Sequence, residues 1–470
     1  MYGRCSGVKP VLLIDFGSTY TKLTAVDVEE EHLLGTAASY TTVQTDINDG
    51  LQKALALLEQ KTGKLEFDAC YACSSAAGGL RMVTSGLVPE LTSEAARLAS
   101  LGAGAKVEKV YNFQLTEDDL KEIIQSKPDI FLLVGGTDGG NTECILHNAK
   151  ALASLRPEFP IVVAGNRTAA RECERILEGC EVYICPNVMP KFGVLNIEPT
   201  QNQIRDIFLN RIIQAKGLSK ATALLSDIMM PTPSAVLQAM NLLAQGIEGE
   251  AGIGELVAVD VGGATTDIYS IADGMPDQMN TVYKGLPEPY AKRTVEGDIG
   301  MRYSIKGIVD AAGLPRITEL SGLSETRIIE LVEDLRLHAD KVPNGDTELE
   351  ALDFALASMA IEEAMKRHAG TMEETYTLMG KTFLQEGKNL TNVKNIVVTG
   401  GSLIHTKCTE EIASHALYSP MQPMSLRPIK ADVWVDRTYI LAAMGLLSGY
   451  YPKVALRIMK KELEHHGYSE

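Results

Sequence analysis

The sequence has little of what marks secreted, membrane or nucleic-acid-binding proteins. Its 470 residues contain one tryptophan and only 6% aromatic residues. No uninterrupted apolar run reaches the roughly 20 residues of a membrane span, and the N-terminus "MYGRCSGVKP" lacks the apolar core of a signal peptide. The formal net charge is −17, whereas a general surface for nucleic acid or anionic lipid needs a basic face. We therefore expect a cytoplasmic protein that binds neither nucleic acid nor a membrane.

Cysteine is also sparse, because eight cysteines in a chain of this length do not suggest a disulfide scaffold. Cys70 and Cys73 fall in an expected strand, where an offset of three points side chains to opposite faces. That geometry argues against a metal pair on one face. We interpret these cysteines as small buried hydrophobic residues.

What is present is an alternating order of elements. Residues 67–187 alternate short apolar strands with helical stretches, starting at "FDACYACSS", and this rhythm predicts a parallel sheet with helices on both faces. Residues 198–247 are expected to be mostly helical, and residues 294–388 largely helical. A chain of 470 residues is long for one core, so two or more lobes are expected.

Two short glycine-rich hairpins repeat one pattern. "LLIDFGSTYTKLTAV" (12–26) aligns with "VAVDVGGATTDIYSI" (257–271), which places Asp15 over Asp260 and Gly17 over Gly262. One such turn alone is most simply a hairpin turn, but the repetition favours a shared function. Backbone N–H groups of a small-residue turn can approach phosphate oxygens, and an aspartate can hold the hydration shell of Mg²⁺.

The repeated hairpins therefore predict a site that holds a triphosphate and Mg²⁺. Asp15 and Asp260 are the candidate catalytic residues and Mg²⁺ ligands, acting on the metal through water. The candidate phosphate-binding residues are Gly17, Ser18, Thr19, Lys22, Gly262, Gly263, Thr265 and Thr266.

A third glycine turn is the candidate site for the base and ribose. "NIVVTGGSLIHT" (395–406) has a short apolar strand, then Thr399 and the turn, then the start of a helix. A flat adenine can lie against the backbone of such a turn because no Cβ is in the way. The candidate nucleotide-binding residues here are Gly400, Gly401 and Ser402.

These three motifs, in this order, resemble the actin, sugar-kinase and heat-shock-chaperone ATPase superfamily. "TPSAVLQAMNLLAQG" (232–246) and "RTYILAAMGLLSG" (437–449) resemble its two inter-lobe helices, with Ala443 and Gly445 where the helices cross. The resemblance implies an α/β actin-like ATPase fold, with two lobes of ribonuclease-H-like mixed sheets flanked by helices and a nucleotide cleft between them. It implies ATP and Mg²⁺ as cofactors. Lobe I is expected to comprise 1–232 with 436–470, and lobe II to comprise 233–435.

One position departs from the superfamily pattern. In the heat-shock chaperones the first connecting segment opens with a glutamate that helps position the attacking water, and the matching residue here is Thr232. Thr232 is therefore a candidate catalytic residue. Hydrolysis that uses another polar group, or that is slow without a partner, stays open as the alternative, as does an alignment shifted by several residues.

A further glycine-rich stretch, "LLVGGTDGGNTE" (132–143), ends a strand and opens a helix that Asn141 or Thr142 could cap. Asp138 in its middle is a candidate catalytic base or ligand. The alternative is a tight turn in which Asp138 bonds its own backbone.

The hairpins together with "CSSAAGGLRM" (73–82), "LLVGGTDGGN" (132–141) and "RTVEGDIGMRYS" (293–304) resemble the glutamate mutase L proteins over essentially the whole chain. The resemblance implies an ATP-dependent reactivating chaperone that releases damaged cobalamin from an adenosylcobalamin-dependent mutase, such as glutamate mutase or an aminomutase. The implied partners are that mutase and ATP or ADP. The chain has no Asp-x-His-x-x-Gly motif for ligating cobalamin.

Two other functions fit the same superfamily at this point. One is a small-metabolite kinase that uses Asp138 as its base, and the other is an ATP-dependent actin-like filament protein. Fold alone does not decide among them. The oligomeric state, including a homo-oligomer, also stays open.

Overall fold

The computed structural model describes residues 10–17, 20–40, 47–75, 80–215, 230–377 and 380–467. The chain forms two compact units. The first comprises Met1–Ala239, Gly285–Pro287 and Ile440–Ile458, and the second comprises Met240–Lys284, Glu288–Tyr439 and Met459–Glu470. Each unit contains its own sheets and its own apolar core.

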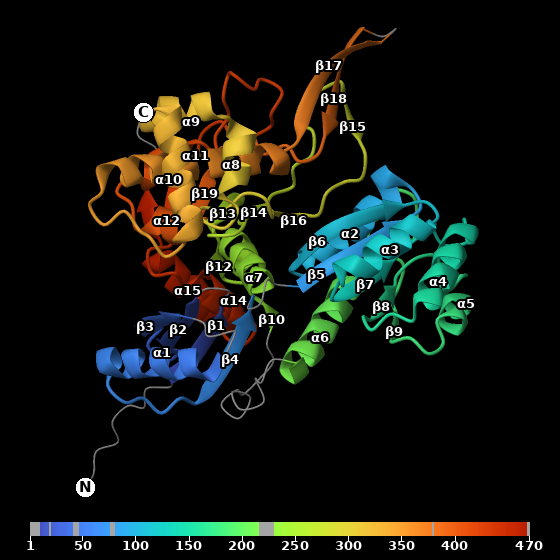
Figure 1. Cartoon of the computed structure of the whole chain (residues 1–470), viewed down its shortest axis with the longest axis horizontal. Helices are drawn as coiled ribbons and strands as arrows, with labels where there is room; N and C mark the ends of the chain where they lie inside the picture. The colour runs from blue at the N-terminus through green and yellow to red at the C-terminus, as the bar shows by residue number, and fades with distance from the viewer. Residues whose placement is uncertain are drawn as a thin grey trace. The chain divides into compact units, whose positions relative to one another are not determined.

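The first unit contains a mixed sheet with the strand order β10-β4-β1-β2-β3 (Figure 1). Its strands are β1 (Pro10–Phe16), β2 (Tyr20–Asp27), β3 (His32–Tyr40), β4 (Ala69–Ser74) and β10 (Met230–Pro231). β1 is buried along its whole length because both of its faces are covered. Leu12 and Ile14 pack in one cluster with Leu51 of α1 (Ile47–Thr62), and α14 (Leu441–Ser448) contacts β1 and β4.

A second sheet of the first unit has the order β6-β5-β7-β8-β9, and every neighbouring pair is parallel. Its strands are β5 (Leu80–Gly86), β6 (Ala105–Asn112), β7 (Ile130–Leu133), β8 (Ile161–Val163) and β9 (Val182–Ile184). One face packs against α2 (Glu94–Gly102) and α6 (Glu198–Ala215), and the other against α3 (Glu117–Ser126), α4 (Glu143–Leu155) and α5 (Ala170–Ile176). This division follows from right-handed crossovers.

The parallel sheet confirms the βαβ prediction, although its first strand was wrongly assigned. "FDACYACSS" was expected to open it, but β4 in that segment pairs with β1 and β10 in the mixed sheet. The parallel sheet starts instead with β5. Burial alone could not distinguish the two strands, because both are apolar and lie close together in the sequence.

The second unit is built on a mixed sheet with the order β16-β14-β13-β19-β20-β21. Its strands are β13 (Leu256–Val261), β14 (Thr266–Ile271), β16 (Ala291–Glu296), β19 (Asn395–Thr399), β20 (Asp432–Val435) and β21 (Glu464–His466). The core is completed by α8 (Ile305–Ala312), α9 (Leu314–Ser321), α10 (Glu325–Leu337) and α11 (Thr347–His368), together with α12 (Gly401–Ile404) and α13 (Thr409–Ser414).

The two mixed sheets share one topology. β3-β2-β1-β4-β10 corresponds in order to β16-β14-β13-β19-β20. The directions also agree, because β1 and β13 are each antiparallel to the strand that follows and parallel to β4 and β19 respectively. The outer pairs match as well. This repeated ribonuclease-H-like sheet confirms the predicted α/β actin-like fold class.

The expected helical stretch 294–388 ends earlier than predicted. β17 (Thr371–Thr377) and β18 (Gly380–Glu386) form an antiparallel pair, and β15 (Thr281–Lys284) lies on the other edge of β18. Threonine and aromatic side chains favour extended backbone there. The pair, orange in Figure 1, extends away from the helices α8–α11 of its own unit.

The chain passes from the first unit to the second within α7 (Thr232–Gln245) and returns after Tyr439. In the first unit, a Cβ added at Gly445 of α14 would lie 1.8 Å from the carbonyl oxygen of Ala235 in α7. The two helices therefore approach backbone to backbone at Gly445, where glycine is needed. The second connecting helix begins at Leu441 rather than at Arg437.

The last residues belong to the second unit, whereas the sequence pattern placed all of 436–470 in the first lobe. The physical reason is a strand: β21 pairs antiparallel with β20, and the ring of His465 stacks on Trp434 with centroids 4.2 Å apart. β21 comes directly after the last helix of the chain, α15 (Pro452–Glu462). Within the described ranges, no helix is long and apolar enough to cross a membrane.

Candidate functional site

The first glycine hairpin joins β1 to β2. The backbone N–H of Gly17 donates to the carbonyl oxygen of Tyr20 at 3.0 Å, and Asp15 lies directly across from Lys22 in the antiparallel register. A Cβ at Gly17 would lie 2.6 Å from the carbonyl oxygen of Tyr20, so the turn needs glycine. The two remaining candidates of this turn, Ser18 and Thr19, lie outside the described residues.

Asp15 gathers three side chains from distant parts of the sequence. Thr232 Oγ1 donates to Asp15 Oδ1 at 2.6 Å, and Lys22 Nζ lies 3.7 Å from Oδ2. Cys73 Sγ, on the neighbouring strand β4, donates to Oδ1 at 3.5 Å. Burial, together with the charge of Asp15, raises the pKa of the Cys73 thiol well above its ordinary value. The thiol therefore stays a neutral donor that helps to fix the orientation of the Asp15 carboxylate.

Asp15, Lys22 and Thr232 were three separate candidates, and the structure brings them together in the first unit. Thr232 reaches this place because β10 pairs with β4 and α7 begins at the end of β10. Cys73 is a contact that sequence reasoning missed. Its position opposite Asp15 in the parallel register of β1 and β4 is visible only once the strands are paired.

The second hairpin joins β13 to β14 in the second unit and repeats the geometry of the first. The N–H of Gly262 donates to the carbonyl oxygen of Thr265 at 2.9 Å, and a Cβ at Gly262 would lie 2.9 Å from that oxygen. Gly263 is exposed, while Asp260 is half-buried at the end of β13. The matching hydrogen bond and the matching aspartate support the predicted repeat of this motif.

The two threonines of the second turn differ in accessibility. Thr266 is buried, and its Oγ1 donates to the carbonyl oxygen of Ile299 at 3.1 Å. A role for this hydroxyl in binding phosphate is therefore not supported, and Thr266 is corrected to a residue that holds the turn. Thr265 is half-buried, with its Oγ1 3.4 Å from Asp267 Oδ2.

Asp267 is a carboxylate of this site that sequence reasoning did not single out. It pairs with Asp260 across β13 and β14, at the position that Lys22 occupies opposite Asp15. Arg293 on β16 is 3% exposed and holds Asp267 Oδ1 at 2.6 Å. The sequence "TTD" (265–267) after the glycines could have pointed to Asp267 as a carboxylate of the turn. Its pairing with the buried Arg293 has no signal in the local sequence.

The segment after β16 braces the second turn from its carbonyl side. The N–H of Met301 donates to Gly262 O at 3.0 Å, and those of Arg302 and Tyr303 donate to Gly263 O at 2.9 and 2.8 Å. Arg302 in turn forms a bidentate ion pair with Asp353 of α11, at 3.0 and 2.9 Å. These bonds fix the carbonyl groups of the glycine pair. They give the stretch 293–304 a physical role.

The third turn lies next to the second hairpin in the same unit. Thr399, at the end of β19, pairs with Asp260 in the parallel register, and a Cβ at Gly400 would lie 2.4 Å from the carbonyl oxygen of Val261. Gly400 also has φ +106°, which a side chain rarely adopts. Gly401 is exposed, and an added Cβ would meet no atom within 4 Å.

Ser402 completes this turn. It is half-exposed, but its Oγ is buried without a hydrogen-bond partner among the described residues. Asp260, Gly262, Gly263, Gly400, Gly401 and Ser402 are thus brought to one edge of the second unit's sheet. The open backbone position at Gly401 is suited to a flat nucleoside.

Asp138 lies elsewhere, in the loop after β7 of the parallel sheet. Its Oδ1 accepts from the backbone N–H of Arg167 at 2.9 Å and from Asn187 Nδ2 at 3.0 Å. Asn141 Oδ1 caps α4 by accepting from the N–H of Cys144 at 3.1 Å, as expected for one of the two capping candidates. Asp138 therefore braces neighbouring loops. Because Oδ1 already accepts two hydrogen bonds, Asp138 is less well suited to act as a catalytic base.

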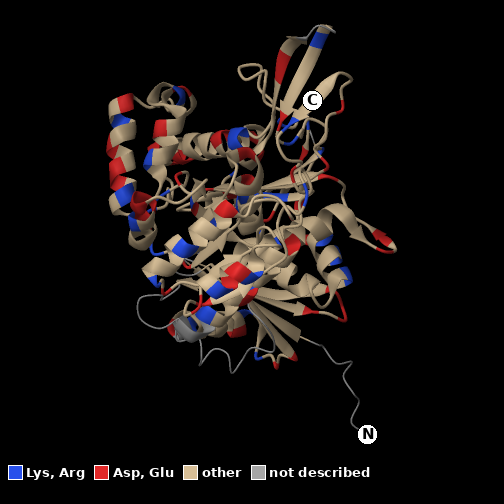
Figure 2. Cartoon of the chain, turned by 90° about the vertical axis from the view of Figure 1, so that its right-hand side faces the viewer, with Lys and Arg blue, Asp and Glu red and all other residues tan. Residues whose placement is uncertain are grey.

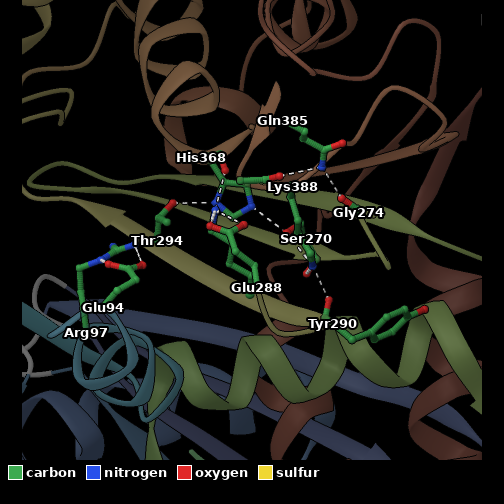
Figure 3. Close-up of polar contacts among 12 residues, drawn as sticks. Glu94, Arg97, Ser270, Gly274, Glu288, Tyr290, Thr294, His368, Gln385 and Lys388 are labelled. Carbon is green, nitrogen blue, oxygen red and sulfur yellow. Dashed lines mark hydrogen bonds and ion pairs between the residues drawn. The ribbon is translucent and has the colours of Figure 1, made fainter. Parts of the chain in front are cut away.

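Figure 3 shows a separate buried polar network in the second unit. His368 bonds Thr294 Oγ1 through Nδ1 at 2.7 Å and Ser270 Oγ through Nε2 at 2.8 Å. Lys388 donates to the carbonyl oxygen of Tyr290 at 2.7 Å and is almost fully buried. Burial, with the nearby charge of Lys292, lowers the pKa of Lys388 to about 7.

The donor set of the two hairpins suits Mg²⁺ and phosphate. Carboxylate oxygens are ligands that Mg²⁺ prefers, and this ion keeps several of its waters. Across the described residues, no three His, Cys, Asp or Glu side chains gather as a direct metal cluster. Asp15 and Asp260, each within its own unit, supply the kind of oxygen ligand that Mg²⁺ takes.

Comparison with known proteins gives two strong sequence matches. A sequence model of the family described as "MutL protein" matches residues 11–463. "Protein MutL" of Clostridium tetanomorphum is 47% identical over 456 residues, which cover 96% of this chain and 98% of that protein.

Solved structures that resemble the chain are distant. An acetone carboxylase in its nucleotide-free form is 13% identical with a TM-score of 0.39, covering 94% of this chain and 70% of that one. A ligand-bound xylulose kinase from Lactobacillus acidophilus is 12% identical with a TM-score of 0.35, covering 98% and 94%. The ethanolamine utilization protein EutJ of Carboxydothermus hydrogenoformans is 11% identical with a TM-score of 0.30, covering 95% and 88%.

Proposed function

Because the chain belongs to the MutL family, which bears out the resemblance to the glutamate mutase L proteins, we propose that it is an ATP-dependent reactivating chaperone. Its task is to release damaged cobalamin from an adenosylcobalamin-dependent mutase, such as glutamate mutase or an aminomutase, in the cytoplasm. One observation carries the ATP-dependent part. Two hairpins of the same topology each place an aspartate before a glycine turn closed by the same backbone hydrogen bond.

The residues that would hold the nucleotide follow from these turns. Gly17 and Gly262–Gly263 offer backbone to phosphate oxygens, Lys22 offers a positive charge, and the turn at Gly400–Gly401 offers an open surface to the base. Mg²⁺, when bound, would neutralise phosphate charge. Asp15 and Asp260 would hold its water ligands.

Thr232 is the residue we propose for orienting the catalytic carboxylate. Its hydroxyl proton is used in the 2.6 Å bond to Asp15, so towards a water its oxygen can act only as a hydrogen-bond acceptor. A threonine can place a water in this way but is a poor base. Slow hydrolysis without a partner protein is the expected consequence.

The mutase would be opened by a change in the arrangement of the two lobes. ATP can drive such a change only by as much as it prefers one arrangement over the other. The connecting helices α7 and α14 are the natural place for this coupling, because their backbones meet at Gly445 and Ala235.

The kinase reading is less well supported. Asp138, its proposed base, lies in the loop after β7 of the parallel sheet, and one of its carboxylate oxygens is engaged by two donors. A kinase would also need an acceptor that is phosphorylated in proportion to ATP use. An actin-like filament would instead pellet with ATP at rising protein concentration.

The test of the chaperone function uses a mutase inactivated with its damaged cofactor in place. The mutase is incubated with the full chain, Mg²⁺, ATP and fresh adenosylcobalamin, and recovered activity and released corrinoid are measured together. Recovery that needs ATP and fails with Asp260→Ala supports the function. ATP-dependent phosphorylation of a small metabolite with no corrinoid released would replace it with the kinase function.

A further inference from the structure

The glycine turn between β13 and β14 leaves backbone donors open. The N–H of Gly262 closes the turn on the carbonyl oxygen of Thr265. The N–H groups of Gly263, Ala264 and Thr265 have no hydrogen-bond acceptor among the described residues, and Gly263 and Ala264 are exposed. Successive backbone N–H groups in a turn can bind an anion. This turn therefore offers open donors to an anionic group that approaches from solvent.

The segment after β16 is packed against this turn. The apolar side chains of Ile299, Met301 and Ile305 are buried. A Cβ added at Gly300 would lie 2.4 Å from the carbonyl carbon of Ala264, so the two backbones are in close contact. Together with the hydrogen bonds to the carbonyl groups of the glycine pair, these contacts fix the segment on the turn.

One side chain of this fixed segment, Tyr303, is exposed beside the turn. Its N–H donates to Gly263 O at 2.8 Å, yet its side chain is 65% exposed. The ring atoms Cδ2 and Cε2 lie 3.7 and 3.8 Å from the position that a Cβ would take at Gly263. The hydroxyl makes no hydrogen bond to any residue that the structure describes. A rigid backbone thus presents an aromatic ring and a phenol donor next to the open N–H groups.

The second hairpin has no cation at the position where the first has one. Lys22 lies across from Asp15, whereas the residue across from Asp260 is Asp267. Arg293, the cation that pairs with Asp267, is 3% exposed. A phosphate at the second turn therefore has no counterpart of Lys22 to meet it.

The cation next to Tyr303 in the chain is also engaged. Arg302 forms its bidentate ion pair with Asp353 and donates to the carbonyl oxygen of Lys341 at 3.2 Å. The open donors at this turn are consequently neutral ones: backbone N–H groups and the phenol hydroxyl. A tyrosine hydroxyl can donate one hydrogen bond to a phosphate oxygen.

The carboxylates of the turn limit the ligand further. Arg293 neutralises Asp267, but Asp260 is half-buried at the end of β13 and repels a bare anion. A phosphate group that arrives with Mg²⁺ brings the cation that compensates for both the carboxylate and the phosphate. The ligand class that fits this turn is therefore a Mg²⁺-bound phosphate chain.

We propose that Tyr303 binds the phosphate chain of the Mg²⁺-bound nucleotide at the second hairpin. Its hydroxyl donates to a phosphate oxygen, and its ring forms a wall beside Gly263. The proposal rests on the proposed function, which brings ATP to this turn. Tyr303 acts here as a binding residue for phosphate, in place of the cation that the first hairpin has in Lys22.

The direct test is equilibrium dialysis of the full chain with labelled ATP and with labelled adenosine, both in the presence of Mg²⁺. Tyr303→Phe, which removes only the hydroxyl, should weaken ATP binding about five- to tenfold, because one hydrogen bond to a charged group is lost. Binding of adenosine, which has no phosphate, should stay unchanged. Unchanged ATP binding would overturn the proposal, as would an equal loss for adenosine, which would place the contact on the nucleoside.

A second variant and a control separate the ring from the hydroxyl. Tyr303→Ala should weaken ATP binding more than Tyr303→Phe does, while the thermal midpoint without nucleotide stays nearly unchanged because the side chain is mostly exposed. The matched control is Tyr418→Phe in the loop after α13, a tyrosine of the same unit that is 37% exposed. It should bind ATP as the wild-type protein does. A loss in Tyr303→Ala alone would overturn the hydrogen bond from the hydroxyl.

Kinetics of ATP hydrolysis distinguish a binding role from a structural one. In Tyr303→Phe, KM for ATP should rise about five- to tenfold with kcat within about twofold of the wild-type value, because a contact made equally before and during the reaction is lost. A residue that only holds the turn in shape would instead lower kcat and the thermal midpoint together. That result would overturn the phosphate contact.

Failure of this proposal can be distinguished from failure of the proposed function. Binding of ATP and reactivation of the mutase are measured on the same preparations. Wild-type affinity for ATP in both Tyr303 variants, with reactivation intact, overturns the role of Tyr303 alone. ATP binding that depends on Tyr303, without reactivation of the mutase, overturns the chaperone function alone. A wild-type chain that binds no ATP overturns both.

Discussion

At the scale of single residues, the account depends on how Asp15 is held. Its carboxylate takes a short bond from Thr232, a thiol donor from Cys73 and the charge of Lys22. Charge-assisted hydrogen bonds of this kind are the strong ones. The carboxylate is thus oriented before any ligand arrives, and Thr232 contributes its shortest contact.

Thr232 can be tested by a pair of substitutions. Thr232→Val keeps the shape but removes the donor, and a hydrogen bond to a charged group is worth about 1.5–3 kcal/mol. We expect the rate of ATP hydrolysis to fall roughly tenfold or more, with little change in KM. Thr232→Ser should restore most of the rate. Full activity in Thr232→Val would show that the bond to Asp15 has no part in hydrolysis.

Lys388 predicts a pH dependence of stability. Its pKa in the folded protein is lowered to about 7 from an ordinary 10.5 by burial. Between these values the unfolded chain binds more protons than the folded chain, so the contribution of Lys388 to stability rises with pH. Below about pH 7 both states are protonated and the penalty is constant.

The measurement is the free energy of unfolding in urea at pH 7 and pH 9. The wild-type protein should gain about 2 kcal/mol from this lysine over that range, and Lys388→Met should lack that gain. Lys292 and Glu288 are the charged neighbours, and the difference between variant and wild type cancels their own titration to first order. Parallel pH profiles for the two proteins would contradict the burial account.

At the scale of elements, substitutions at the two glycines of the turn at Gly400 and Gly401 should affect different properties, one stability and the other ATP binding. Gly401→Val introduces a side chain into open space, whereas Gly400→Val meets Val261 O and forces an unfavourable φ. Gly401→Val should therefore keep the thermal midpoint while weakening ATP binding about tenfold, because crowding against a ligand costs about 1–3 kcal/mol. Gly400→Val should lower the midpoint itself. Calorimetry without nucleotide and ATP titration measure the two effects, and unchanged affinity in Gly401→Val would remove the adenosine assignment.

The crossing of α7 and α14 gives a second element-scale prediction. Gly445→Ala places a methyl group 1.8 Å from Ala235 O, so the helices must separate and stability should fall by about 1–3 kcal/mol or more. Gly449→Ala is the matched control, because its added Cβ would make only an ordinary 3.6 Å contact with Leu446 O. Urea unfolding compares the two. Equal stability would mean that the helices do not cross closely in solution.

Elements also show where the sequence was informative. The paired hairpins and the βαβ rhythm were predictable because their signals are local: an apolar run, a short turn and a second run. The sheet to which β4 belongs and the pair β17–β18 were not predictable, because a strand's place in a sheet depends on partners elsewhere in the chain. No local sequence signal predicts the hydrogen bonds from residues 301–303 to the carbonyl oxygens of Gly262 and Gly263. The same holds for the hydrogen bond from Asn187 to Asp138.

At the scale of the whole molecule, each of the two units contains a mixed sheet of the same strand order. The same strand order carries an aspartate to the same place at the start of each glycine turn. Counted over the sequence, the net charge of −17 is −4 in the first unit and −13 in the second, and acidic and basic residues share the same helices (Figure 2). Recognition of a partner protein is therefore expected to depend on particular surfaces rather than on net charge.

The most direct test of the central claim is the release of phosphate from ATP by the purified full chain with Mg²⁺ and no acceptor. Wild-type protein should release phosphate slowly, and Asp15→Ala and Asp260→Ala should each abolish release. Asp260→Ala should leave thermal unfolding without nucleotide nearly unchanged, whereas Asp15→Ala should lower the midpoint because Thr232 and Cys73 lose their acceptor. That outcome would show that both hairpins serve one ATPase. Full hydrolysis in either aspartate variant would contradict the account, because the repeated hairpin would then have no part in the reaction.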